Sequence, residues 1–360
     1  SLPHVGPNPG AGGGGPYWCG FFVQAPWRTY IHYNDPRLIE KYYSQMKEWF
    51  KYVDKYTVDG LLKRWPDTKY RDWYLGDWLA PMGVDAGNQA SVDLVCNCFI
   101  SDCLSTMEKT ALKLGKEEEA QAFALRKKQL NELIHESFYR ADEGIYATGS
   151  QLDMSYPMLV GVVPNVLYDK VKEKMIATTE QKHKGHIAVG LVGVPILTEW
   201  VTRNKEVNLF YQMLKKRDYP GYLYMIDNGA TATWEYWSGE RSRVHNCYNG
   251  IGTWFYQAIG GLKLDEAAPG YRHVFIDPQI PTGVTWARIT KESPYGEIAV
   301  RWELKDSRLN LQVSVPAGVT ATVCTPKNAV ICQKDGKKIN IEKGSVAVEA
   351  GEFAFEFLLQ

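Results

Sequence analysis

The sequence predicts a mainly α chain that ends in an all-β domain. Apolar residues recur near a 3.6-residue spacing over most of the first 262 residues, in stretches separated by Gly, Pro or polar turns. From Ala267 onward, short alternating or β-branched runs replace them. The length of 360 residues exceeds what one core usually holds, which favours two or three domains.

The helices are predicted in order along the chain. Asp35-Pro36 is typical of a helix start, and the periodic residues after it predict a helix over 36–56. A second apolar stripe predicts a helix over 88–114 that ends at Gly115, with an antiparallel neighbour over 117–139. Further helices are expected over 150–159, 165–179, 189–203, 206–215 and 246–260. Antiparallel pairs of long helices joined by variable loops suit a helical toroid.

The C-terminal part is predicted to be an antiparallel β-sandwich. Its turns are expected at 293–296 and at Asp335-Gly336. The change of pattern places a boundary near residue 265, so we expect a helical domain over 1–265 and a β domain over 266–360. The expected strands lie over 273–276, 298–303, 310–315 and 320–325 and within 346–359.

Composition and charge exclude several classes of protein. The 41 Lys and Arg residues balance 41 Asp and Glu residues, so the electrostatic term that dominates nucleic-acid binding is missing. No apolar run approaches the roughly 18 residues that a membrane-spanning helix needs. We therefore expect neither a nucleic-acid partner nor a membrane partner.

The cysteines and glycines do not indicate a metal or a cofactor. The chain has seven cysteines, an odd number, so at least one thiol is free. Three of them lie in one predicted helix, and their spacing does not bring four metal ligands together (Cys96, Cys98 and Cys103). The glycine run at 12–15 has no Lys-Ser or Lys-Thr after it and no strand before it, unlike a phosphate-binding loop. We expect no metal and no cofactor.

Aromatic residues give the first functional hint. The chain has 12 Trp and 22 Tyr, whose flat apolar faces and polar rims match the C–H patches and hydroxyls of a sugar ring. A Trp-rich helical core is an equally good explanation of this composition.

The densest constellation places one carboxylate between two indoles. In the segment 229–237, Glu235 lies between Trp234 and Trp237, just after a turn, and His245 follows ten residues later. A partly desolvated carboxylate suits a general acid or base acting at a sugar's anomeric carbon. The structural alternative makes Glu235 a helix-capping carboxylate and His245 a core histidine.

Two further clusters combine indoles with small residues. Gly76 lets the backbone come close, while Asp77 and Trp78 offer hydroxyl acceptors and an aromatic face; the alternative is an Asp N-cap beside a core Trp. Trp18 follows the glycine-rich opening, which is expected to be a loop, and loop indoles are typical ligand platforms.

Four stretches in order resemble the α-L-rhamnosidases of glycoside hydrolase family seventy-eight. The first two are Gly76-Asp77-Trp78-Leu79 and the segment 186–195. The third leads from 219–227 into Thr233-Trp234-Glu235-Tyr236-Trp237. The last comprises 268–272, 286–288 and Ser293-Pro294-Tyr295-Gly296. The resemblance spans nearly the whole chain. It implies an (α/α)6 toroid, here without its first helices, followed by a C-terminal antiparallel β-sandwich.

The resemblance also implies roles for the site residues. Glu235 matches the general base of an inverting hydrolase, which activates water against a terminal α-L-rhamnoside. Trp18, Trp78 and Trp237 are expected to contact the sugar, Asp77 to lie nearby, and His245 to contact a ring hydroxyl. The implied partner is a rhamnose-containing oligosaccharide or glycoside, and the family favours a periplasmic or extracellular location.

The family's general acid has no counterpart in this sequence. That acid belongs to an Asp-Glu-Arg type motif upstream of the segment that begins near Trp18, and the residues before Trp18 here include no carboxylate. We therefore expect the acid in an N-terminal remainder of the same polypeptide, and little or no hydrolysis by this chain alone. Two alternatives remain open: a non-catalytic carbohydrate-binding fragment, and an (α/α)6 glycosidase that acts on another sugar.

Overall fold

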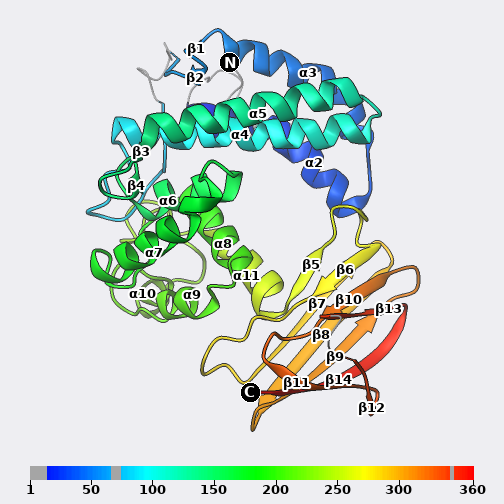
Figure 1. The fold of residues 1–360 in the computed structure, drawn as a ribbon. Coiled ribbons are helices and arrows are strands. Elements are labelled where there is room, and N and C mark those ends of the chain that lie inside the picture. Colours follow the sequence, from blue (N-terminus) through cyan, green and yellow to red (C-terminus); the bar gives the residue numbers. More distant parts are fainter. Residues whose placement is uncertain (1–13, 66–73, 341–343) are drawn as a thin grey trace. The chain divides into compact units, whose positions relative to one another are not determined.

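Two long antiparallel helices are the longest elements of the structure, a computed structural model that describes residues 14–65, 74–340 and 344–360. α4 (Gln89–Lys113) and α5 (Glu117–Phe138) lie side by side (Figure 1). The chain reverses at Gly115, whose φ of 70° lies in the left-handed region that favours glycine. Asn88 caps α4 by accepting a backbone N–H of its first turn. Both predicted helices are confirmed to within one residue at each end.

The described residues divide into two compact units. The helical unit takes them from 1–27, 37–201 and 209–251, and the β unit from 28–36, 202–208 and 252–360. Two short segments from the helical part of the sequence therefore pack with the β unit. The boundary expected near residue 265 stays a prediction.

The helical unit contains most of the predicted helices. α3 (Arg37–Asp54) turns six apolar residues inward at helical spacing, among them Met46, Trp49 and Phe50. An ion pair of 2.7 Å joins Lys47 of α3 to Glu119 of α5. The other helices that match predicted stretches are α6 (Gln151–Val160), α7 (Asn165–Gln181), α8 (Gly193–Arg203) and α9 (Val207–Leu214).

Several details of the helical prediction were wrong. The segment around Trp18 was expected to be a loop, but it forms α1 (Pro16–Cys19) and runs directly into α2 (Phe21–Tyr33), which tolerates an internal Pro26. The predicted helix over 246–260 is broken into a 3₁₀ turn, the one-turn α11 (Gly252–Trp254) and a π-helical turn. In this part of the chain the prediction also lacked α2, α10 (Tyr222–Asp227) and two short hairpins, β1 (Thr57–Val58) with β2 (Leu61–Leu62) and β3 (Tyr139–Arg140) with β4 (Ile145–Tyr146). In the β part it lacked the strands over 262–264, 286–293, 329–334 and 337–338.

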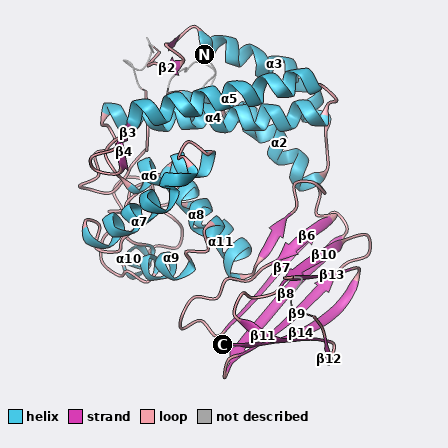
Figure 2. Cartoon of the chain, viewed as in Figure 1, coloured by secondary structure: helices cyan, strands magenta, loops and turns pink. Residues whose placement is uncertain are grey.

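The β unit contains two sheets, whose strands are coloured magenta in Figure 2. The six-stranded sheet has the order β12-β11-β14-β9-β8-β7 and is antiparallel throughout. Its strands are β7 (Trp286–Ser293), β8 (Gly296–Lys305), β9 (Arg308–Val315), β11 (Ala329–Lys334), β12 (Lys337–Lys338) and β14 (Gly351–Leu359).

The second sheet has four strands in the order β13-β10-β6-β5. They are β5 (Leu262–Leu264), β6 (His273–Ile276), β10 (Thr320–Cys324) and β13 (Ser345–Val348). β10 and β6 run parallel, which departs from the antiparallel pattern expected. The two predicted turns are confirmed: Ser293 pairs with Gly296 across one, and Asp335 and Gly336 both have positive φ in the other.

The core of the β unit follows from strict alternation along its strands. In β8 and β9, residues such as Val300, Trp302 and Leu311 are buried, while Arg301 and Gln312 between them face outward. The Trp302 indole N–H donates to the carbonyl of Ile259 at 2.7 Å, so this large side chain is buried without an unsatisfied donor. Among the described residues, no helix has the length and apolar character needed to cross a bilayer.

Candidate active site

Glu235 and His245 lie on two hydrogen-bonded segments of one loop. The backbone N–H of Glu235 donates to the carbonyl of Ser242 at 2.9 Å, and that of His245 donates to the carbonyl of Thr233 at 2.8 Å. The Thr233 hydroxyl donates back to the carbonyl of His245 at 2.5 Å. These bonds fix the spacing of Glu235 and His245 without a regular helix or strand.

The carboxylate of Glu235 is partly exposed and only weakly engaged. Its Oε2 accepts the backbone N–H of Ser242 at 3.4 Å, near the limit of a hydrogen bond. Glu235 lies between α10 and the 3₁₀ turn and caps no described helix, so the helix-capping alternative is wrong. A partly exposed carboxylate with free lone pairs can accept a proton from water.

The histidine is oriented through its own backbone neighbourhood. His245 Nδ1 accepts the N–H of Cys247 at 3.1 Å. In the neutral imidazole this bond assigns the proton to Nε2, which becomes a hydrogen-bond donor. The side chain is half-buried, so it is not a core histidine.

The two indoles beside Glu235 point into the core. Trp237 is 1% exposed, donates its N–H to the carbonyl of Val189 at 2.9 Å and stacks on Tyr248. Trp234 is also buried, with the guanidinium of Arg243 over its ring. The expected contact between Trp237 and the sugar is not supported, because a side chain without an exposed face cannot contact a ligand. Both indoles instead anchor the segment that carries Glu235.

Asp77 is a buried clamp. Its carboxylate accepts three backbone N–H groups, from Gly190 at 2.6 Å and from Val192 and Gly193 at 3.0 Å each. The last two lie at the start of α8, so Asp77 caps that helix from more than 100 residues away in the sequence. It is neither the cap of an adjacent helix nor a group with free oxygens for a sugar.

The environment of Asp77 changes its protonation. Burial raises the pKa of this carboxyl from 3.8 to about 6, and the three N–H groups act in the opposite direction. On the far side of the same loop, the fully buried Gln151 accepts the N–H of Ala188 and donates to the carbonyl of His186. The segment 186–193 is therefore held by buried polar groups on both sides.

Trp18 and Trp78 form an edge-to-face pair. Their ring centroids lie 6.4 Å apart, with 84° between the planes. The backbones near the two indoles are paired, because Gly14 bridges to Tyr74 and the carbonyl of Gly14 accepts the N–H of Leu75 at 3.2 Å. Both indoles are half-buried, so each keeps part of its surface exposed.

Tyr248 joins the Trp78 loop to the Glu235 loop. Its hydroxyl lies 2.9 Å from the carbonyl of Leu79 and 3.2 Å from that of Glu235. Sequence reasoning did not single out Tyr248, because no local pattern distinguishes it from the other 21 tyrosines. The structure thus brings the paired indoles, the Asp77 clamp, Glu235 and His245 into one part of the helical unit.

Neither a metal cluster nor a reactive thiol accompanies this site. No group of three or more His, Cys, Asp and Glu side chains in the described ranges could hold a metal ion. All seven cysteines are free thiols. Cys96, Cys98 and Cys103 are fully buried in α4, and this burial raises their pKa, as expected of core residues.

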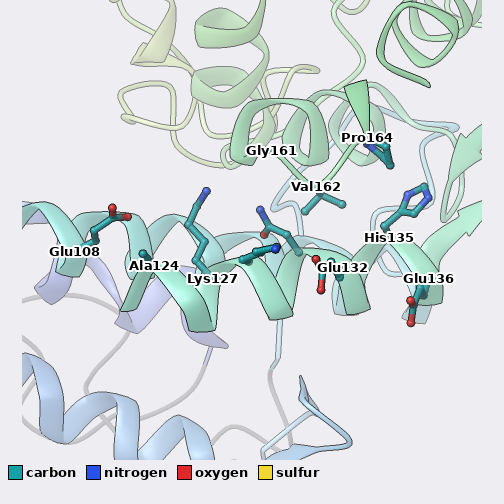
Figure 3. A pocket seen from close by; sticks show the side chains of 11 residues that line it. Glu108, Ala124, Lys127, Glu132, His135, Glu136, Gly161, Val162 and Pro164 are labelled. Atoms are coloured by element: carbon teal, nitrogen blue, oxygen red, sulfur yellow. The ribbon is translucent and has the colours of Figure 1, made fainter. Parts of the chain in front are cut away.

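A separate cavity of 570 Å³ lies where α4 and α5 meet the connection between α6 and α7. Lys127 and His135 of α5 point toward the segment 161–164 (Figure 3). Lys127 donates to the carbonyl of Val160, and His135 Nδ1 lies 2.6 Å from the Tyr146 hydroxyl. This cavity contains none of the predicted site residues.

Helical hairpins followed by a β domain are the architecture of the six-hairpin glycosidases. Residues 1–259 match the family described as bacterial alpha-L-rhamnosidase 6 hairpin glycosidase domain, and residues 261–340 match the bacterial alpha-L-rhamnosidase C-terminal domain. The chain belongs to the bacterial α-L-rhamnosidase family and comprises these two domains of its C-terminal portion.

Curated relatives agree with this assignment. The chain is 27% identical over 353 residues to an α-L-rhamnosidase of Alteromonas sp. (strain LOR), covering 93% of this chain and 37% of the relative. It is 28% identical over 372 residues to an α-L-rhamnosidase of Streptomyces avermitilis, covering 99% and 34%. The chain thus spans little more than a third of the length of these relatives.

Solved structures show the same fold. An α-L-rhamnosidase from Dictyoglumus thermophilum superposes with a TM-score of 0.86 at 21% identity, over 96% of this chain and 40% of that one. The Streptomyces avermitilis enzyme complexed with L-rhamnose superposes with a TM-score of 0.84 at 24% identity, over 97% and 34%.

Proposed function

We propose that this chain supplies the general base and the sugar-contacting indoles of an enzyme that hydrolyses terminal α-L-rhamnosides with inversion. The observation that carries the proposal is the partly exposed carboxylate of Glu235, held in a chain that belongs to the α-L-rhamnosidase family. Its loop is fixed by main-chain bonds and by the buried Trp237, so the carboxylate has a defined position.

Glu235 acts on water rather than on the sugar itself. The carboxylate takes a proton from a water molecule as the water oxygen bonds to the anomeric carbon. The glycosidic C–O bond breaks on the opposite face, and a carboxylic acid protonates the departing oxygen. An inverting pair needs the two carboxyl groups roughly 6.5 to 9.5 Å apart. We place the general acid outside this chain, upstream of Trp18.

The remaining site residues bind the sugar or position the base. Trp18 and Trp78 offer exposed aromatic surface to the C–H face of the ring. His245 offers its Nε2–H to a ring hydroxyl. Asp77 and Trp237 hold the loops that carry these groups, which is a positioning role.

The test uses the full-length protein that contains this chain. We expect it to hydrolyse an aryl α-L-rhamnoside, and proton NMR during the first minutes to show β-L-rhamnose before mutarotation mixes the anomers. Initial release of the α anomer would contradict inversion. A panel of aryl glucosides, galactosides and glucuronides tests the sugar, since hydrolysis of one of these instead of the rhamnoside would refute the proposed substrate.

The 360-residue chain alone tests the placement of the acid. A base without an acid cannot protonate the leaving oxygen, so we expect calorimetric binding of L-rhamnose with little or no turnover. Turnover by the isolated chain at the full-length rate would show that the acid lies within it.

A further inference from the structure

The outer face of the six-stranded sheet carries a groove that the catalytic proposal does not use. The groove has a volume of 490 Å³ and crosses β7, β8, β9 and β14, which are adjacent strands (Figure 1). Because side chains alternate between the two faces, the large apolar residues of β8 and β9 lie on the core face. On these two strands the outer face has smaller or polar residues.

The strand register arranges the groove in two rows. In one row Arg288 pairs with Arg301, Arg301 with Gln312, and Gln312 with Ala354. In the next row Ala299 pairs with Ser314, and Ser314 with Glu352. Long polar side chains therefore make up most of one row, and small side chains make up most of the other.

The long side chains of the groove have no partner in the part of the chain that the structure describes. Those of Arg288, Arg301, Gln312 and Glu352 make no hydrogen bond or ion pair with the described residues. Two arginines placed directly opposite each other across a strand pair repel, which destabilises the sheet. An external molecule with several acceptor oxygens would satisfy the N–H donors of both guanidinium groups.

An exposed indole lies on the same face. Trp286 is 67% exposed and precedes Arg288 by two residues on β7, about 7 Å along the strand. An indole this exposed leaves most of its apolar surface in contact with solvent. A flat aromatic face beside planar donors and carboxylate acceptors matches a pyranose ring with its hydroxyls.

We propose that this face of the C-terminal domain binds a neutral glycan chain at a site of its own. The balance of charges argues for a neutral ligand, because Arg288 and Arg301 are matched by Glu352 and Asp335 around the groove. The guanidinium groups donate to hydroxyl and ring oxygens, the carboxylates accept from hydroxyls, and Trp286 stacks on a sugar face. This inference does not require Glu235 to be catalytic.

Affinity electrophoresis of the 360-residue chain tests the site. Native gels contain neutral rhamnan, dextran or polygalacturonate, and we expect retardation by a neutral polysaccharide that persists in 0.3 M salt, since screening does not weaken uncharged contacts. Trp286→Ala and Arg301→Gln should each raise the dissociation constant about tenfold. The controls Phe275→Ala and Arg272→Gln alter an exposed aromatic residue and an exposed arginine outside the groove and should bind like wild type.

The outcomes are distinguishable from failure of the catalytic proposal. We expect Glu235→Gln to be retarded like wild type, and Trp286→Ala in the full-length protein to hydrolyse a small aryl rhamnoside at the wild-type rate. No retardation in either neutral gel, or equal retardation of wild type and both groove variants, would overturn the site. Retardation confined to polygalacturonate and abolished by salt would overturn the neutral ligand.

Discussion

The indole of Trp237 stacks on the ring of Tyr248, with centroids 4.1 Å apart and planes 20° apart. This buried stack positions the Tyr248 hydroxyl between the carbonyls of Leu79 and Glu235. The proposed base is therefore held through its main chain by an aromatic pair in the core, while its side chain stays accessible. Several consequences of this arrangement can be measured.

Removal of the bridging hydroxyl should affect both stability and rate. Tyr248→Phe keeps the stack but leaves two carbonyls without this donor, so the free energy of unfolding should fall by about 1 to 2 kcal/mol. We expect kcat on an aryl rhamnoside to fall several-fold with little change in KM, because the displaced group is the base. Tyr256→Phe, at an exposed tyrosine of the β unit, is the control and should change neither quantity. Wild-type kcat in Tyr248→Phe would show that the bridge does not position Glu235.

Asp77 should give stability a specific pH dependence. Its pKa of about 6 in the folded protein exceeds the ordinary 3.8, so the folded state binds the proton more tightly than the unfolded state. Unfolding then releases a proton between pH 6 and 4, and the free energy of unfolding gains on the order of 3 kcal/mol from this group as the pH falls through that window.

Urea unfolding of wild type and Asp77→Asn measures this contribution. Asparagine cannot accept all three N–H groups, so the free energy of unfolding of the variant should be lower at pH 7 by about 1 to 3 kcal/mol. This difference from wild type should widen toward pH 4, because only wild type gains stability on protonation. The control Asp142→Asn, at an exposed turn, should have the same free energy of unfolding as wild type at both pH values. If the difference in free energy of unfolding between wild type and Asp77→Asn does not change with pH, the raised pKa of Asp77 is contradicted.

The indole pair should act on substrate affinity. Trp78→Ala or Trp18→Ala removes an aromatic surface from the proposed sugar site, and each should raise KM for an aryl α-L-rhamnoside about tenfold. Trp286→Ala removes an indole from the other unit and should leave KM unchanged. If Trp18→Ala and Trp78→Ala both keep the wild-type KM, the two indoles do not contact the substrate.

Much of the fold could be predicted because the signals are local. The helices around 88–114 and 117–139 carry long periodic stripes with caps, and the β strands carry strict alternation. α2 was missed because Pro26 and the preceding glycines are typical of loops, yet the helix accommodates the proline. The parallel pairing of β10 with β6 was missed because the paired residues are 47 positions apart, and the sequence of neither strand indicates its partner.

The site was predictable by segment but not by side chain. The sequence identified the segments that carry Trp18, Trp78, Glu235 and His245, and these segments do lie together. It could not indicate which face Trp237 presents, nor that Asp77 serves a loop more than 100 residues away, because both depend on tertiary packing. Consequently the indole of Trp237, an expected sugar contact, is a core residue, and the carboxylate of Asp77, expected near the sugar, caps a helix.

The proposal as a whole depends on Glu235, and one substitution tests it most directly. In the full-length protein, Glu235→Gln keeps the shape of the side chain and removes the base, so kcat on an aryl α-L-rhamnoside should fall about 10²- to 10⁴-fold with an unchanged unfolding midpoint. The matched variant Glu240→Gln, at an exposed position in the same loop, should keep wild-type kcat. A Glu235→Gln enzyme that turns over at nearly the wild-type rate would contradict the account.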